Sequence, residues 1–427
     1  MRKSQVTRLL GLMVVLTMVV AACGDGGTEG TTTTAEPAAT TTAAAEPTTT
    51  AGEPTASLLI WADANRAPVF ESISEAFTEQ TGVEVNVEIK DFGDMREAVK
   101  LAAPAGEGPD LFVGAHDWTG ELAADGVIAP VELGAAGSDF FQVALDGFSF
   151  EGQLYAVPVA TEAIAMFYNV DLVPEPPATM EEVQAACEGL EGIENCIGVP
   201  GAGDGPDFYH NVWFITAPGG YVFAYDPETG YDTSDIGLDS EGAIEGAQVI
   251  ESLTADGVMA ATNYDTAKNL FLEGSQPFWV TGPWEVGTLT DSDLNWGVAK
   301  LPTINGNTPA PFVGAQGVFA SAFSENAVIV QSFLVDFIAT TETQLALYEA
   351  DPRNPAMNSV LDELADNEVV QTFTLSGADG IPMPNIPAMN AVWGAAGDNI
   401  LALRNGEVDA QTAMETAATQ VEAALAE

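Results

Sequence analysis

Two short polar segments, 62–66 and 114–118, each follow a run of residues that the sequence predicts to be a buried strand. The carboxyl ends of parallel strands meet at one edge of a sheet, and open α/β proteins bind ligands outside that edge. The polar and aromatic side chains of the two segments are Asp63, Asn65, Arg66, His116, Asp117 and Trp118. Carboxylate and guanidinium groups form strong, charge-assisted hydrogen bonds, so a polar ligand is expected to bind beside them.

Enzymatic chemistry has little support in the sequence. The chain contains no Gly-x-Ser-x-Gly elbow, no phosphate-binding loop and no His-Glu-x-x-His pair. A glycoside hydrolase needs two carboxylates about 5 to 10 Å apart, one of them kept protonated. A chain with 63 acidic residues can offer such pairs by chance, so a surface glycoside hydrolase stays open as the alternative. Because the catalytic motifs are missing, we expect a protein that is not an enzyme and needs no cofactor.

Strands and helices alternate around these segments. Residues 57–61 form an apolar run, 69–77 carry apolar residues at helical spacing, and 83–89 alternate apolar and polar residues. A helical stretch at 95–103 and an apolar run at 111–113 repeat the pattern. The sequence therefore predicts an α/β fold whose first sheet is largely parallel.

A second lobe is expected because the chain, at 427 residues, is long for one compact domain. The alternating stretch 152–164 is interpreted as a strand that crosses into this second α/β lobe, and 312–320 as the segment that returns. The predicted N-terminal lobe comprises residues 57–160 and 316–370, and the predicted C-terminal lobe comprises residues 161–315 and 371–427.

Acidic residues dominate the chain, with 63 Asp and Glu against 11 Lys and Arg, for a net charge of -52. Three of the basic residues, Arg2, Lys3 and Arg8, lie at the start of the chain. Nucleic acid is excluded as a partner because phosphate binding needs a basic surface. The acidic residues are spread along the whole chain, which indicates a solvated acidic surface.

Residues 1–22 have the parts of an export signal: basic residues, an apolar run at 9–20 and two small residues. Val-Ala-Ala-Cys at 20–23 resembles the lipobox of bacterial lipoproteins, which implies cleavage before Cys23 and acylation of that cysteine. An ordinary secretory signal is the alternative. Residues 23–56 are then the acylated cysteine and a disordered tether rich in Thr, Ala and Pro. We expect the protein to lie outside the cytoplasm, in the periplasmic or cell-wall space, with its lipid as the only contact with the membrane.

Cys187 and Cys196 remain once Cys23 is assigned to acylation. Disulfides persist outside the cytoplasm, so these two thiols are expected to pair. The loop between them is short, and the chain-entropy model gives such a bond about 2 to 3 kcal/mol of stabilisation. No metal site is expected, because one would need more ligands than the two thiols and the two histidines, His116 and His210, readily supply.

Several further segments occur in one order along the chain: Gly108-Pro109-Asp110, Ala115-His116-Asp117-Trp118, Tyr168-Asn169-Val170-Asp171-Leu172, Gly282-Pro283-Trp284, Pro311-Phe312-Val313-Gly314 and Met383-Pro384-Asn385-Ile386-Pro387. In these segments and their order, the chain from Leu59 onward resembles the maltose/maltodextrin-binding proteins of bacterial ABC importers. The resemblance implies a two-lobed periplasmic-binding-protein fold, with a mostly parallel sheet in each lobe and a multi-strand hinge. It also implies that the lobes close on a sugar and deliver it to the permease subunits of the importer.

The resemblance also implies which residues bind the ligand. In the first lobe they are Asp63, Asn65, Arg66, Asp117 and Trp118, near the hinge is Glu162, and in the second lobe they are Asp207, Tyr209, Trp284, Met383 and Trp393. Aromatic rings cover the apolar faces of a sugar, and carboxylates accept hydrogen bonds from its hydroxyl groups.

Alternatives remain for most of these residues. Trp284 and Trp393 can be core residues, and Asp117 and Glu162 can be helix caps or part of a hinge salt bridge. Segment 62–66 can be a solvated loop. His116 is interpreted as a structural histidine and is left out of the site.

Three glycines depart from the best-known members of that family. Gly114 and Gly394 stand where those members have aromatic residues, and Gly397 stands near the position of an arginine. The expected cargo is maltose or a maltodextrin, and trehalose or another solute is the alternative.

Overall fold

The computed structural model describes residues 56–201, 205–226 and 230–426. All of them belong to one compact unit, Pro54–Glu427. The predicted signal peptide, Cys23 and the tether up to residue 55 lie outside the described residues. Within the described ranges, no helix combines the length and apolarity needed to cross a membrane.

The first sheet has the strand order β15-β7-β14-β3-β1-β2, and β4 and β16 pair with β14. Strands β1, β2 and β3 are parallel, whereas β14 runs antiparallel to both β3 and β7. The strand bounds are β1 (Ser57–Ala62), β2 (Glu84–Ile89), β3 (Leu111–Ala115), β4 (Ile128–Ala129), β7 (Ala156–Glu162), β14 (Phe312–Ser321), β15 (Asn354–Pro355) and β16 (Ile381–Pro382).

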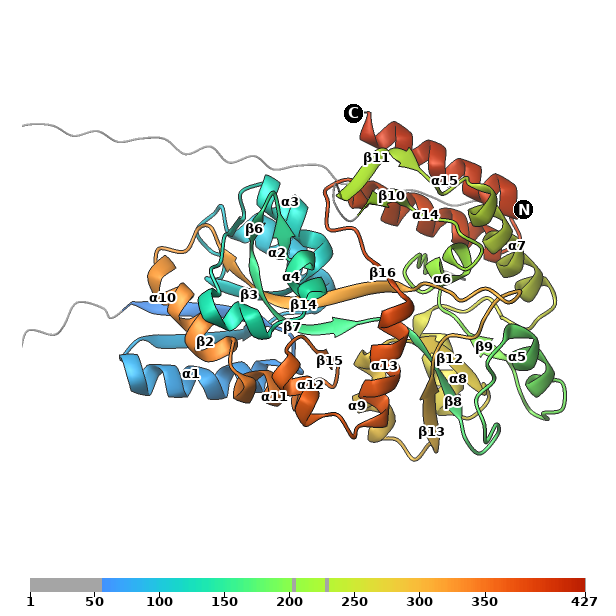
Figure 1. Ribbon diagram of the computed structural model, residues 1–427, viewed down its shortest axis with the longest axis horizontal. Coiled ribbons are helices and arrows are strands. Elements are labelled where there is room, and N and C mark those ends of the chain that lie inside the picture. Colours follow the sequence, from blue (N-terminus) through green and yellow to red (C-terminus); the bar gives the residue numbers. More distant parts are fainter. Residues whose placement is uncertain (1–55, 202–204, 227–229, 427) are drawn as a thin grey trace, which may run out of the picture. The chain divides into compact units, whose positions relative to one another are not determined.

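Local sequence explains the βαβ units that build this sheet. Helix α1 (Ala67–Thr81) has a proline in its first turn and ends at Gly82, whose φ of 75° glycine adopts without strain. Helix α2 (Phe92–Ala102) is capped at its N-terminus by Asp91, whose side chain accepts a hydrogen bond from the Gly93 N–H. The prediction of alternating strands and helices is confirmed here. Figure 1 shows these elements in blue and cyan.

The second sheet has the order β13-β8-β12-β9. Strands β9, β12 and β13 share one direction and β8 opposes them, so two of the three pairings are antiparallel and the sheet is mixed, where a mostly parallel sheet was expected. The bounds are β8 (Ala165–Asn169), β9 (Ile197–Gly198), β12 (Phe278–Thr281) and β13 (Trp296–Ala299).

Most helices cover the two sheets or pack on one another. Helices α14 and α15 pack together, and α15 also contacts α7 (Figure 1). The helix bounds not yet given are α3 (Thr119–Ala124), α4 (Gln142–Gly147), α5 (Met180–Cys187), α6 (Val212–Thr216), α7 (Glu241–Ala255), α8 (Tyr264–Leu272), α9 (Val286–Thr290), α10 (Ala327–Phe333), α11 (Thr341–Ala350), α12 (Asn358–Glu363), α13 (Glu368–Asp379), α14 (Met389–Arg404) and α15 (Ala410–Leu425). Two small hairpins complete the fold: β5 (Ser149–Phe150) with β6 (Gln153–Leu154), and β10 (Phe223–Asp226) with β11 (Gly230–Ile236).

Strand β14 connects the two lobes, since it contributes to the cores of both. Its Val318 packs in the apolar cluster under the first sheet, and its Phe312 packs in the cluster of the second. The connection from β7 to β8 is a second link. The segment from β16 to Pro387 is a third, because Asn385 donates from its side chain to three backbone carbonyls at residues 146, 147 and 149. The two lobes are therefore joined by a multi-strand hinge, as predicted.

The sulfur atoms of Cys187 and Cys196 are bonded to each other. Cys187 ends α5, and Cys196 immediately precedes β9. The bond joins the helix to the edge strand of the second sheet, the pairing that the sequence predicts.

Candidate functional site

Side chains from both sheets converge where the strands end at the hinge. From the first lobe come Asp63 after β1, Asp117 in a 3-10 turn after β3, and Glu162 at the end of β7. From the second come Tyr209, which precedes α6, and Trp284, in a 3-10 turn after β12. These residues are far apart in the sequence, and the geometry below brings them into one group.

Alternating charges link the first-lobe residues. Arg66 Nε lies 2.6 Å from Asp63 Oδ2 and 3.7 Å from Asp351 Oδ2. Arg353 Nε lies 2.7 Å from the same Asp351 oxygen, and Arg353 Nη1 lies 2.5 Å from Glu162 Oε2. Burial raises the pKa of Asp63, but the charge and hydrogen bonds of Arg66 outweigh it and leave that pKa below its usual value. Asp63 and Arg66 therefore form part of a buried ion network, and segment 62–66 is more than a solvated loop.

Arg353 connects this network to the second lobe. Its guanidinium carbon lies 5.7 Å from the centre of the Trp284 ring, within the range of a cation–π contact. Arg353 precedes β15 in the first sheet, whereas Trp284 follows β12 in the second. Glu162 and Trp284 therefore flank one guanidinium group, and an acid of the first lobe meets an aromatic ring of the second.

Trp284 is held in its orientation by a chain of hydrogen bonds. Its Nε1 donates to Tyr264 Oη at 2.6 Å, Tyr264 donates to Glu285 Oε1 at 2.7 Å, and Lys268 Nζ lies 2.8 Å from Glu285 Oε2. Gly282 is required for this arrangement, since a Cβ atom there would lie 2.0 Å from the Trp284 ring. In the motif Gly282-Pro283-Trp284, the missing side chain of the glycine therefore leaves room for the indole of Trp284 to pack against the backbone at Gly282.

Aromatic rings continue from Trp284 across the second lobe. The ring centres of Tyr209 and Trp284 are 6.1 Å apart, those of Tyr209 and Phe312 are 6.4 Å apart, and those of Phe312 and Trp393 are 6.2 Å apart. Trp284, Tyr209 and Trp393 keep part of their surface exposed. Aromatic rings in such a row suit a ligand with apolar faces, such as a chain of sugar rings.

Two polar groups in this region have unused hydrogen-bonding capacity. Within the described part of the chain, the Asp117 carboxylate has no hydrogen-bond partner other than its own N–H. Burial raises its pKa, and the nearby charge of Glu162 raises it further. The Tyr209 hydroxyl is buried without a partner among the described residues, and burial raises the pKa of Tyr209 well above its usual value. Buried polar groups are costly when unpaired, so ligand hydroxyl groups would stabilise both.

Other predicted site residues have partners inside the protein. Asp207 accepts from the His210 backbone N–H at 2.9 Å and contacts His210 Nδ1 at 2.7 Å. Although burial raises it, the pKa of Asp207 is lowered overall by His210. The side chain of Asn65 is exposed to solvent. Asp207 is therefore less available to a ligand than Asp117, and Glu162 is likewise paired, with Arg353.

Trp118 is buried and packs against Phe92, with the ring centres 5.2 Å apart. A Cβ atom at Gly114 would lie 2.7 Å from the Trp118 ring, so Trp118 fills the space beside that glycine. At Gly394 a Cβ atom would meet nothing within 4 Å. Trp118 is therefore a packing residue beside Gly114, and the space beside Gly394 is open.

His116 has the structural role expected of it. Its Nδ1 accepts from the Ala315 backbone N–H, and its Nε2 lies 3.0 Å from the carbonyl oxygen of Met383. Because Nδ1 accepts, Nε2 carries the proton and donates. The ring thereby holds the segment at Met383 against β14, and Met383 itself is buried with 7% of its surface exposed.

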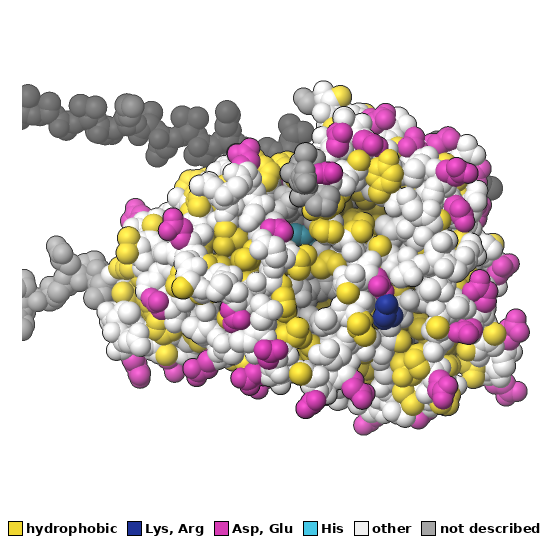
Figure 2. Space-filling view, in the orientation of Figure 1, with side chains coloured by type: hydrophobic (Ala, Val, Ile, Leu, Met, Phe, Trp, Pro, Cys, Tyr) yellow, Lys and Arg dark blue, Asp and Glu magenta, His cyan; other side chains and the backbone are white. Residues whose placement is uncertain are grey.

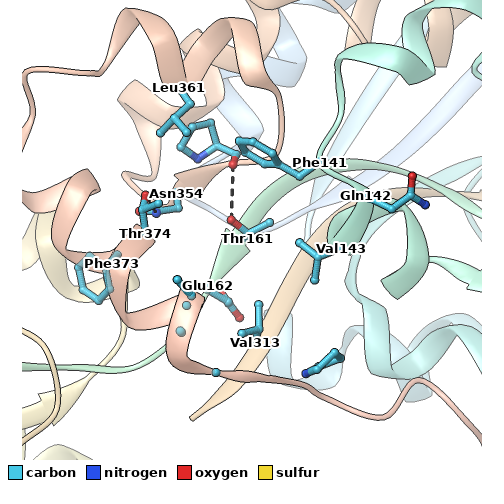
Figure 3. Close-up of a pocket in the computed structure, with 16 residues that line it drawn as sticks. Phe141, Gln142, Val143, Thr161, Glu162, Val313, Asn354, Leu361, Phe373 and Thr374 are labelled. Carbon is cyan, nitrogen blue, oxygen red and sulfur yellow. Dashed lines mark hydrogen bonds between the residues drawn. The ribbon is translucent and has the colours of Figure 1, made fainter. Parts of the chain in front are cut away.

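Two cavities lie next to the hinge, one on each side of Val313. The first, about 450 Å³, is lined by Glu162, Thr161, Phe141 and residues of α13 such as Phe373 (Figure 3). The second, about 520 Å³, is lined by His116, Met383, Tyr225 and Tyr231. Apolar side chains surround a hollow near the middle of the face drawn in Figure 2. The lining of both cavities omits Asp117, Tyr209, Trp284 and Trp393. Among these four residues, Tyr209 and Trp284 contact each other through their rings.

Sequence reasoning missed Arg353, Tyr264 and Phe312. Basic residues are scarce after the first eight positions, so each remaining Lys or Arg is a signal that could have drawn attention to Arg353. Tyr264 contacts Trp284 through a hydrogen bond that no sequence pattern indicates. Among the described residues, no group of three or more His, Cys, Asp or Glu side chains is arranged to hold a metal ion.

Comparison with known proteins gives a consistent picture. A family described as bacterial extracellular solute-binding protein matches residues 72–372. A maltotriose-binding protein of Pyrococcus abyssi is 31% identical over 357 residues, covering 80% of this chain and 76% of the relative. A galactooligosaccharide-binding protein of Bacillus subtilis is 28% identical, covering 85% and 88%. A maltooligosaccharide ABC transporter solute-binding lipoprotein of Streptococcus pneumoniae is 26% identical, covering 97% and 96%. All three relatives are binding proteins by name.

Proposed function

The chain belongs to the family of bacterial extracellular solute-binding proteins, and we propose that it captures a maltodextrin-type oligosaccharide between its two lobes. The observation that carries the proposal is the meeting of Glu162 and Trp284, from different lobes, on either side of Arg353. Next to them, the Asp117 carboxylate and the Tyr209 hydroxyl can form further hydrogen bonds with a ligand. Aromatic faces beside unpaired polar groups match the two chemical surfaces of a sugar ring.

The ligand acts by stabilising closure. A sugar that contacts Asp117 and Glu162 of one lobe and Trp284 of the other binds the closed arrangement better than an open one, so it shifts the population toward closure. The proposed lobes are residues 57–160 with 316–370, and 161–315 with 371–427, and Glu162, the last residue of β7, extends from the first sheet across this boundary at the hinge. The closed form then delivers the sugar to the permease subunits of an ABC importer, the class of transporter named for the streptococcal relative.

The protein acts at the outer face of the cell membrane. Acylation of Cys23 after removal of residues 1–22 anchors it there, and the streptococcal relatives named as lipoproteins support this anchor. Residues 23–56 tether the globular unit to the lipid. The protein is not an enzyme and releases its cargo unchanged, in keeping with relatives that are named as binding proteins.

A galactooligosaccharide is the second candidate cargo, favoured by the relative from Bacillus subtilis. Calorimetric titration of the purified protein with maltose, maltotriose, trehalose, a galactooligosaccharide and an amino-acid mixture separates the candidates. Maltotriose should bind with one-to-one stoichiometry and be recovered intact. Binding of the galactooligosaccharide alone would move the cargo to that class, and binding of no sugar would contradict the proposal.

A further inference from the structure

Arg353, like Arg66, has a largely buried guanidinium group held between carboxylates, but Arg353 also contacts Trp284 of the second lobe. The guanidinium is largely buried, with 13% of the side chain exposed, and two carboxylates hold it in a fork. Nε donates to Asp351 and Nη1 donates to Glu162. Although burial lowers it, these two charges raise the pKa of Arg353 above its usual value. The group is therefore charged and fixed in place.

One edge of the guanidinium has no protein partner. Within the described residues, neither an acceptor nor an acid contacts Nη2, which carries two N–H donors. The same guanidinium lies over the Trp284 ring at 5.7 Å. Trp284 keeps part of its surface exposed, so a sugar ring on that part can place a hydroxyl or ring oxygen against Nη2.

The charges around Arg353 restrict the chemistry of that ligand. Three carboxylates, from Asp63, Glu162 and Asp351, contact two guanidinium groups, from Arg66 and Arg353, and the Asp117 carboxylate lies near Glu162. The guanidinium charges are already balanced by these acids, and the excess charge is negative. An anionic sugar would be repelled, whereas a neutral sugar can donate its hydroxyl groups to the acids.

We infer that Arg353 is a ligand-binding residue that donates from Nη2 to an oligosaccharide on the Trp284 face, and that the site selects neutral over acidic oligosaccharides. The inference rests on the proposed function and adds to it a contact and a substrate class. Arg353 acts as a planar donor, not as a counter-ion for the ligand.

Calorimetry of the wild-type protein and two variants tests the contact. Arg353→Met removes all donors, and maltotriose affinity should fall by about tenfold or more, as for a lost hydrogen bond from a charged group. Arg353→Lys keeps the charge next to Glu162 and Asp351 but lacks the planar second edge, so affinity should fall severalfold while the melting temperature stays near that of the wild type. Lys300→Met, which breaks the surface pair with Asp379, is the matched control and should leave affinity unchanged.

The outcomes separate the contact from the proposed function. If the wild type binds no sugar, the proposed function fails. If the wild type binds maltotriose and folded Arg353→Lys binds it equally well, the contact alone is overturned. Should Arg353→Met not fold, the lysine variant carries the test.

The charge argument is tested with trigalacturonate, an acidic trisaccharide, against the wild-type protein. No binding is expected for this ligand. Affinity equal to that for maltotriose would overturn the selection of neutral sugars.

Discussion

The indole Nε1 of Trp284 donates a hydrogen bond to the hydroxyl oxygen of Tyr264 across 2.6 Å. Because this single N–H is satisfied within the protein, the indole offers a ligand only its faces. Tyr264 in turn is fixed by Glu285, so the plane of the indole is set before any ligand binds. Trp284 is a preorganised stacking surface, so ligand binding does not have to pay the conformational entropy of ordering its side chain.

Replacement of Trp284 by alanine should weaken maltotriose binding by about 2 kcal/mol or more, roughly thirtyfold, as for aromatic residues at the centre of an interface. Trp284 is partly exposed, so the melting temperature of the unliganded protein should change little. Calorimetry and thermal unfolding measure the two effects.

Trp279 is the matched control, because it lies in strand β12 and is fully buried. Trp279→Ala should cost about 3 to 5 kcal/mol of stability, as for large core residues. If Trp284→Ala destabilised the protein to a similar extent and left affinity intact, Trp284 would be a core residue.

Tyr264→Phe tests whether the hydrogen bond positions the indole. The variant keeps the ring but leaves Trp284 Nε1 and Glu285 without their shared partner, which should cost about 1 kcal/mol of stability. Maltotriose affinity should fall severalfold, measured by calorimetry. Tyr221→Phe, which removes an exposed hydroxyl bonded to Asp235, should change neither quantity. Equal affinity of the Tyr264 variant and the wild type would show that the indole needs no such support.

Asp117→Asn should raise stability while it weakens binding. The folded protein raises the pKa of Asp117, so folding favours the protonated carboxyl and is penalised where the group is ionised. The gain in the free energy of unfolding should be full at neutral pH, shrink as pH falls through the raised pKa, and vanish below the unfolded pKa. Maltotriose affinity should fall by about 10- to 150-fold, since a charged acceptor is lost.

Denaturant unfolding at several pH values, together with calorimetry, checks the Asp117 prediction. Asp256→Asn is the control, because Asp256 is an exposed acid at the end of α7. A stability gain that grew in acid, or an unchanged affinity, would contradict the role given to Asp117.

Loss of the disulfide should lower stability without touching the site. The bond closes a loop with a sequence separation of 9, for which the chain-entropy model gives about 2 to 3 kcal/mol. The double variant Cys187→Ser/Cys196→Ser should therefore melt at a lower temperature and bind maltotriose as the wild type does. A large loss of affinity would mean that α5 and β9 influence the site.

Much of the fold could be predicted because it depends on local patterns. Apolar periodicity located β1, α1 and β2, and Gly82 marked the helix end. The antiparallel course of β8 and β14 could not be read this way, since strand direction depends on partners far away in the sequence. The direct turn from β7 into β8 and the long strand β14 are tertiary features.

The same distinction between local patterns and tertiary contacts separates the site residues that the sequence could predict from those that it could not. Asp117, Glu162, Tyr209 and Trp284 could be proposed because each lies in or near a segment with a recognisable pattern. Arg353 could not, because its importance depends on Glu162, almost two hundred residues earlier, and on Trp284 in the other lobe. Asp207 shows the reverse case, in which a plausible acid is already paired with His210.

A crystal structure of the protein with bound maltotriose tests the central claim most directly. The sugar should lie on the Trp284 face, with hydroxyl groups within hydrogen-bonding distance of Asp117 and Glu162, so that both lobes contact one ligand. A sugar bound elsewhere, for example in the cavity between Phe141 and Phe373, with Trp284 and Asp117 untouched, would contradict it.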